Sequence, residues 1–182
     1  MPYPYEFLTG QRSDVEESRA KLQKIIAELE AAMKERFLEQ FAAIRENFKI
    51  VFAELFGGGR ADIVMSDEKD CLNCGIEINA QPPGKTLKNI LLLSGGEKAL
   101  TAIALLFGIL RMRPTPFCML DEIESALDEA NVYKFAAYTK ALSKETQLIL
   151  ITHRKGTMES ADSLYGVTME EKGVSKVLSV KL

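Results

Sequence analysis

The chain has 182 residues, of which 47% are hydrophobic and 27% are charged, a balance typical of an ordinary globular protein with one large or two small domains. Its 23 basic and 26 acidic side chains give a net charge of -3, which excludes a global basic field that would attract DNA. Met1-Pro2-Tyr3-Pro4 lacks the charged start of a signal peptide, and every apolar stretch is too short for a membrane span. We therefore expect a cytoplasmic protein without a membrane partner.

The first third of the chain shows one long helical pattern. Apolar residues recur every three or four positions and form a single stripe: Leu22, Ile26, Leu29, Met33, Phe37, Phe41, Ile44, Phe48, Val51 and Leu55. Ser13 and Glu16 predict an N-terminal capping box, and the three glycines at 57–59 predict the end of the helix. A helix of about forty residues favours a coiled coil or a rod, while packing on the chain's own domain stays open for residues 37–52.

Short strands follow the glycines. Residues 61–65 and 75–80 have the composition and alternation of strands, and Pro82-Pro83-Gly84 predicts a turn. Gly84 and Lys85 resemble the end of a phosphate-binding P-loop. That motif needs a glycine five residues before Gly84, where this chain has Asn79, so the sequence excludes a P-loop.

The three cysteines do not suggest a disulfide framework, because their number is odd and small. Cys71 and Cys74 form one CxxC pair, and the only histidine, His153, is far away in the sequence. A single pair could complete a zinc site only with ligands from elsewhere. We expect two reduced thiols in a loop.

The second half of the chain predicts an α/β arrangement. The predicted elements are a very apolar helix over 94–111, a central strand over 117–120, a helix over 127–142, a buried strand over 147–152 and a hairpin of 163–169 and 175–182. The order strand, helix, strand predicts a parallel sheet with crossover connections.

Ser94-Gly95-Gly96-Glu97 opens the apolar helix. Ser94 and Glu97 by themselves are a capping box, which is a structural feature. A cap does not require the two glycines, whereas the close approach of a phosphate to bare backbone N–H groups at a positive helix terminus does. The segment therefore indicates a phosphate site.

Asp121 and Glu122 follow the strand over 117–120 directly. Two adjacent carboxylates after buried residues are unfavourable unless a cation such as Mg²⁺ neutralises them. His153 ends the next predicted strand, and parallel strands bring such residues to the sheet edge where ligands bind. A solvated acidic pair and a plain strand-end histidine are the structural alternatives. Taken together, the motifs indicate a magnesium nucleotide site.

These motifs occur in the order and spacing of an ABC-type ATPase. The segments over 92–102, 120–131 and 152–158 resemble the signature motif, the Walker B motif with the D-loop, and the H-loop of the structural maintenance of chromosomes (SMC) family, in its bacterial form. The segments over 56–59 and 81–85 are also similar. The resemblance implies that 57–182 form the C-terminal lobe of the ABC-type ATPase head, a mostly parallel sheet with flanking helices. Residues 1–56 would be the coiled-coil root and the long helix entering the head.

The resemblance also implies roles at the nucleotide that this head would bind. Asp121 would hold Mg²⁺, Glu122 would orient and polarise the water that attacks the γ-phosphate of ATP, and His153 would contact that phosphate. These three residues would serve one ATP molecule.

A second head would bring another ATP molecule. Ser94, Gly95 and Gly96 would bind the γ-phosphate of that nucleotide, and Asp128 would lie on the dimer interface. ATP would then hold the two heads together, and hydrolysis would release them. Because the signature helix gains its anion only in the dimer, nucleotide affinity and dimerisation would be linked.

The family's Walker A lysine and Q-loop lie in an N-terminal lobe, and neither occurs in this sequence. We therefore expect the isolated chain to be inactive and to need that lobe as a partner. Residues 4–8 resemble the stretch where the returning coil re-enters the head, and 14–33 would be the coil root. A kleisin winged-helix domain would dock near 163–182, and DNA would bind through the full, nucleoid-associated complex. The implied role is chromosome condensation and segregation.

Two alternatives stay open. One is a DNA-repair ATPase with the same split head, although that group has its zinc-binding CxxC at the coil apex, whereas Cys71 and Cys74 follow the end of the predicted coil. The other is a module without enzymatic activity that only docks a partner.

Overall fold

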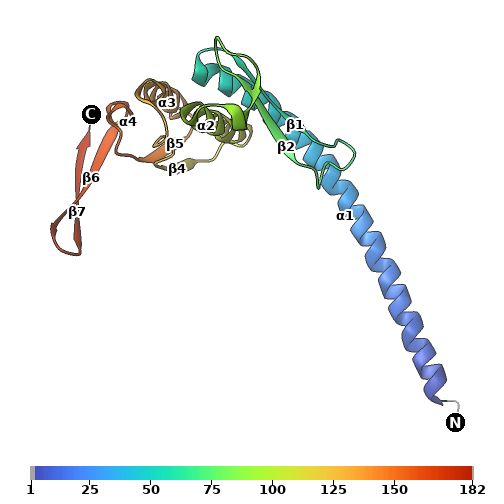
Figure 1. The fold of residues 1–182 in the computed structure, drawn as a ribbon. Helices are drawn as coiled ribbons and strands as arrows, with labels where there is room; N and C mark the ends of the chain where they lie inside the picture. The colour runs from blue at the N-terminus through green and yellow to red at the C-terminus, as the bar shows by residue number, and fades with distance from the viewer. Residues whose placement is uncertain (1–2, 182) are drawn as a thin grey trace. The chain divides into compact units, whose positions relative to one another are not determined.

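The computed structural model describes residues 3–181 of the chain (Figure 1). Met1, Pro2 and Leu182, which belong to the predicted N-terminal and hairpin segments, lie outside the described residues. Two compact units are present, one of residues 1–42 with 65–75 and the other of residues 43–64 with 76–182. No helix within 3–181 has both the length and the apolarity that crossing a membrane requires.

Helix α1 extends over Tyr3–Phe56, 54 residues, and so confirms the long helix. The predicted start at Ser13 is wrong. The turns before Ser13 are already helical, as the Thr9 hydroxyl shows by donating to the Tyr5 carbonyl over 2.7 Å, so no free N–H groups need capping there. Gly57 and Gly58 follow the helix with positive φ angles of 72° and 128°, and the Gly58 N–H donates to the Ala53 carbonyl, which confirms the predicted end.

The apolar stripe of α1 has two different environments. In the first unit it is exposed, with Leu22, Ile26 and Met33 retaining more than half of their accessible surface. In the second unit Phe48 and Val51 are fully buried. In the first unit the stripe is therefore exposed, as on a coiled-coil helix without its partner. In the second unit it is buried, as on a core helix.

The first unit also contains the loop that carries the CxxC pair. This loop follows strand β1, Arg60–Met65, and precedes strand β2, Ile76–Gln81. Both thiols are free, Cys71 is buried, and the Cys74 thiol lies 3.7 Å from the Cys71 carbonyl. Across residues 3–181 the structure shows no cluster of three or more potential metal ligands.

The core of the second unit is built from three helices. These are the end of α1, helix α2 over Gly95–Met112 and helix α3 over Glu129–Leu142. Phe107 stacks against Phe135 and Tyr138, with ring centroids 6.0 and 5.2 Å apart. Gly108 lets α2 approach α1 closely, because a Cβ atom there would lie 3.0 Å from the Phe48 backbone.

Three sheets organise the described strands. Strands β1, β2 and β3, the last being Lys88–Asn89, form the first sheet, and a 3₁₀ turn over Ile90–Leu92 leads from β3 towards α2. Strands β4, Phe117–Asp121, and β5, Gln147–Ile151, pair in parallel. Helix α4, Lys155–Glu159, precedes the antiparallel hairpin of β6, Ser163–Glu171, and β7, Val174–Lys181. These pairings confirm the predicted parallel strands and terminal hairpin.

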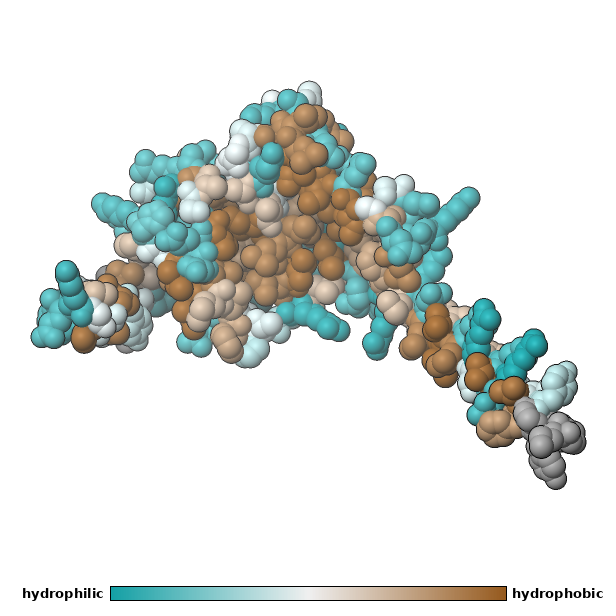
Figure 2. Space-filling view, turned by 60° about the horizontal axis from the view of Figure 1, so that its bottom comes forward, coloured by the Kyte–Doolittle hydropathy of each residue, from teal (hydrophilic) through white to brown (hydrophobic). Residues whose placement is uncertain are grey.

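The expected burial of β4 and β5 is wrong for this chain by itself. Phe117 and Met119 on one face of β4 are 57% and 59% exposed, while Leu120 on the other face is 5% exposed. Ile149 and Ile151 of β5 are also exposed. A continuous apolar sequence is typical of a strand whose sheet is covered on both faces, but α2 and α3 lie on only one side of this sheet (Figure 1). One face of the sheet is left as exposed apolar surface, and Figure 2 shows a broad hydrophobic area on the molecule.

Candidate nucleotide site

Ser94 is the N-cap of α2, as expected, and Gly95 after it is open to solvent. Ser94 and Gly95 are exposed, and no protein atom outside the local chain lies within 4 Å of the position that a Gly95 Cβ would occupy. The first N–H groups of a helix have no partner within the helix and carry its positive end. An anion can therefore approach the bare backbone here, which fits a phosphate.

Glu97 closes the cap. Its Oε2 accepts from the Ser94 N–H over 3.3 Å and from the Ser94 hydroxyl over 2.8 Å, while its Oε1 lies 2.7 Å from Lys85 Nζ. The hydrogen bond from Lys85 is the main reason why the pKa of the Glu97 carboxyl lies below its usual range, and the bonds from Ser94 add to it against the opposing effect of burial. The carboxylate is thus held ionised between the helix start and the turn that carries Lys85.

Asp121 and Glu122 lie at the carboxyl end of β4. Asp121 is the last residue of the parallel register and pairs with Ile151. Glu122 adopts a φ of 48°, and its N–H donates to the Ile151 carbonyl over 2.9 Å. A left-handed conformation at a residue other than glycine is strained by roughly 1–3 kcal/mol, and such strain concentrates at functional sites. Both carboxylates are exposed.

His153 lies beside Glu122, as the predicted sheet edge requires. Its Nδ1 is 3.3 Å from Glu122 Oε1, and both side chains are more than half exposed. The parallel pairing of β4 with β5 brings the two residues to the same edge, although 31 positions separate them. The pair can act together on one ligand, while an exposed contact of this kind adds little stability.

Asp128 starts α3 as its N-cap and lies beside Gly96. Its carboxylate accepts from the Asn131 N–H over 2.9 Å and from the Asn131 side chain over 3.2 Å. A Cβ added at Gly96 would be 3.7 Å from Asp128 Oδ2. The structure thus brings Ser94, Gly96 and Asp128 into one neighbourhood.

The site residues fall into two groups, the signature group of Ser94, Gly95, Gly96 and Asp128 and the acidic group of Asp121, Glu122 and His153. Within 3–181 no hydrogen bond or ion pair joins a side chain of one group to a side chain of the other. Each group therefore presents its own set of contacts to a ligand.

Sequence reasoning missed two residues beside the site. Arg154 donates from Nη2 to the Leu127 carbonyl over 2.7 Å, so it joins the segment after β5 to the segment before α3. Lys85 pairs with Glu97, although in the sequence it was notable only as the end of a false P-loop. No local pattern signals either contact, because the partners are 27 and 12 residues away.

The donors present fit a magnesium nucleotide. Mg²⁺ usually takes one or two carboxylates and completes its octahedron with phosphate oxygens and water, so Asp121 alone can hold it when a nucleotide is bound. The bare backbone at Gly95 and Gly96 fits a phosphate, as described above.

Known proteins resemble this chain over nearly its whole length. The family model described as "RecF/RecN/SMC N terminal domain" matches residues 8–176. The chromosome partition protein Smc of Bacillus subtilis (strain 168) is 60% identical over 98% of this chain, and this chain spans 15% of its length. The chain therefore covers only a small part of that relative.

Solved structures show the same similarity. One, titled "Structural biochemistry of ATP-driven dimerization and DNA stimulated activation of SMC ATPases", has a TM-score of 0.75 and 44% identity, covering 81% of this chain and 89% of its own. Another, the SmcHead bound to the C-winged helix domain of ScpA, has a TM-score of 0.71 and 46% identity, covering 80% of this chain and 44% of its own. With a family match over residues 8–176, the chain belongs to the RecF/RecN/SMC family.

Proposed function

We propose that this chain is the C-terminal lobe of the ABC-type ATPase head of a chromosome-partitioning SMC protein. The proposal rests on one observation: the candidate site residues form two separate groups. The signature group lies at the start of α2, and the acidic group lies at the edge of β4 and β5. The matching family model is described as an N terminal domain. The assignment to the C-terminal lobe rests on the motif content of this chain, which has Walker B, D-loop and H-loop motifs and no P-loop.

The acidic group would act on the nucleotide bound to its own head. Asp121 would hold Mg²⁺, which neutralises charge on the phosphate oxygens. Glu122 would accept a hydrogen bond from the attacking water and so orient it towards the γ-phosphate. His153, 3.3 Å from Glu122, would lie next to the same phosphate. Glu122 has its left-handed backbone directly after the end of β4.

The signature group would act on a nucleotide bound to a second head. Ser94, Gly95 and Gly96 would donate hydrogen bonds to its γ-phosphate, and Asp128 would lie on the same interface. In a two-fold dimer each chain would then contribute to both nucleotides. ATP binding and head pairing would stabilise each other, because each interaction is complete only in the presence of the other.

Partners would cover the exposed apolar surfaces. We assign the exposed face of β4 and β5, with Phe117, Met119, Ile149 and Ile151, to the N-terminal lobe of the same protein. The hairpin of β6 and β7, whose Tyr165 is 72% exposed, would receive a kleisin winged-helix domain, as the neighbour bound to ScpA suggests. The complete complex would bind DNA on the nucleoid in the cytoplasm.

The test is the pairing of heads in the full-length protein. Replacing Ser94 with Arg should leave ATP binding intact and abolish ATP-dependent head pairing, because the much larger arginine side chain fills the space of the phosphate at the helix start. Ser13→Arg, which changes an exposed serine of α1, is the matched control and should pair like wild type. Gel filtration with and without ATP measures pairing, and a persistent dimer in Ser94→Arg would contradict contact across heads.

The two alternatives have separate tests. The DNA-repair reading is weakened by the position of Cys71 and Cys74, which lie in the loop after β1 and not at a coil apex. The docking module without enzymatic activity predicts no ATP turnover even with the N-terminal lobe present. Disrupting the β6 and β7 hairpin should remove the kleisin in a pull-down while the response to ATP remains.

A further inference from the structure

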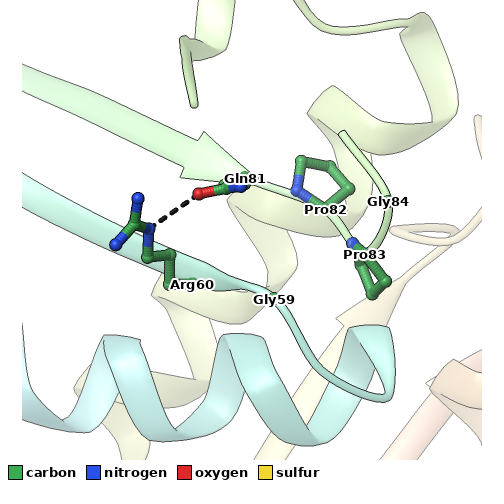
Figure 3. A pocket seen from close by; sticks show the side chains of 6 residues that line it. All are labelled: Gly59, Arg60, Gln81, Pro82, Pro83 and Gly84. Carbon is green, nitrogen blue, oxygen red and sulfur yellow. Dashed lines mark hydrogen bonds between the residues drawn. The ribbon is translucent and has the colours of Figure 1, made fainter. Parts of the chain in front are cut away.

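A chain of polar contacts leads from strand β1 to the turn before the signature motif. Arg60 Nε donates to Gln81 Oε1 over 2.7 Å, a contact drawn in Figure 3, and Gln81 Nε2 donates to the Lys85 carbonyl over 2.8 Å. The Lys85 side chain then reaches Glu97 Oε1 over 2.7 Å. Four residues from β1, β2, the turn and α2 are therefore joined in sequence, and the link from Gln81 reaches Lys85 at its backbone carbonyl.

The turn that carries Lys85 is held closely on the glycines after α1. The Lys85 N–H donates to the Pro82 carbonyl over 3.1 Å, and Gly84 has a φ of 75°. A Cβ at Gly59 would lie 2.3 Å from the Gln81 carbonyl oxygen, so only glycine allows this approach (Figure 3). Two hydrogen bonds, one to the Pro82 carbonyl and one from Gln81 Nε2, thus hold the backbone of Lys85.

Glu97 connects this turn to the signature serine. One carboxylate oxygen contacts Lys85, and the other accepts from the hydroxyl and the N–H of Ser94. The Glu97 side chain is 15% exposed and the Lys85 side chain 53%, so the carboxylate end of this contact is shielded from solvent while the ammonium end is not. The Lys85 ammonium is therefore the cation that balances the Glu97 carboxylate beside the phosphate site.

We propose that Lys85 is a positioning residue of the signature motif, which acts through Glu97 to make Ser94 available to the γ-phosphate of a nucleotide on the partner head. This inference rests on the proposed function. A hydroxyl has one proton to donate, and in the present structure Ser94 donates it to Glu97. The phosphate must compete for that proton, and Lys85 weakens the competitor by balancing its charge. The same charge reduces the repulsion between Glu97 and the phosphate.

The experiment measures ATP-dependent head association by sedimentation in the full-length protein, in a Glu122→Gln background that keeps ATP unhydrolysed. Lys85→Met should weaken association about 3- to 10-fold, and Lys85→Arg should restore most of it, because coupling energies of this kind are modest. Lys88→Met is the matched control. Lys88 is an exposed lysine three positions further along, it has no ion pair in the described part of the chain, and its variant should associate like wild type.

A second variant, Glu97→Gln, tests whether Lys85 acts through Glu97 or only through its own charge. In Glu97→Gln the amide oxygen still accepts from Ser94 but has no charge, so Lys85→Met should change association less than about twofold there. Equal weakening in both backgrounds, or no weakening by Lys85→Met in the first, would overturn the role of Lys85. If the head with the native Lys85 and Glu97 itself failed to associate with ATP, the proposed function would fail, and this inference with it.

Discussion

Gly95→Ala separates a phosphate site from a plain helix cap, because the two interpretations predict different outcomes. No atom outside the local chain lies within 4 Å of the new Cβ, and Gly95 is the first residue of α2. Replacing glycine with alanine in an unstrained helix stabilises by about 0.5–1 kcal/mol, which corresponds to a Tm increase of about 1–4 °C for a domain of this size. A cap without a ligand should therefore only become more stable.

A phosphate site predicts a functional loss beside that gain. The methyl group would hold the phosphate away from the backbone N–H groups, and losing one charge-assisted hydrogen bond costs about 1.5–3 kcal/mol, or about 10- to 100-fold in ATP-dependent association. Thermal melting followed by circular dichroism measures the first effect, and sedimentation of the full-length protein with ATP measures the second.

Gly108→Ala is the matched control within the same helix. Its Cβ would meet the Phe48 backbone at 3.0 Å, so this variant should be destabilised by about 1–3 kcal/mol. A Gly95→Ala protein that melts higher and still pairs its heads like wild type with ATP would refute the phosphate-site reasoning.

Two further predictions concern charged groups. Glu122→Gln should lower ATP turnover about 10²- to 10⁴-fold in the head completed with its N-terminal lobe, since the neutral amide polarises the water less than the carboxylate does and cannot take its proton; unchanged turnover in a phosphate-release assay would remove Glu122 from that role. The bond from Arg45 holds the pKa of the Asp62 carboxyl below its ordinary value of 3.8, so the stabilisation is present above that pH and is lost as pH falls through the folded-state pKa. In the Asp62→Asn variant, the free energy of unfolding measured with urea should therefore fall less between about pH 5 and 2 than in wild type. An unchanged dependence on acid pH would contradict the assignment.

Local patterns predicted the elements with strong periodicity. The stripe of α1, the apolar helix α2 and the β6 and β7 hairpin follow from spacing and turn residues alone. The start of α1 did not, because Ser13 and Glu16 match a capping box whether or not the chain before them is helical. The short elements β3 and α4 are below the length at which periodicity is visible.

At the candidate site, the sequence predicted one contact between strand ends but not the longer-range contacts around it. Parallel pairing of two strands, each followed by a polar residue, correctly brought Glu122 next to His153. The contact of Lys85 with Glu97 depends on a turn fixed by glycine packing at residue 59, and no spacing rule contains that information. The exposed face of β4 shows why burial is harder still, since an apolar run does not reveal which chain covers it.

The most direct measurement is a structure of the Glu122→Gln head, completed with its N-terminal lobe, with ATP and Mg²⁺ bound. The account predicts a two-fold dimer in which Ser94 Oγ lies about 2.7–3.2 Å from the γ-phosphate of the partner's nucleotide, while Asp121 faces the Mg²⁺ of its own. Ser94 and Asp121 of one chain around the same nucleotide, or a signature helix start without any phosphate, would contradict it.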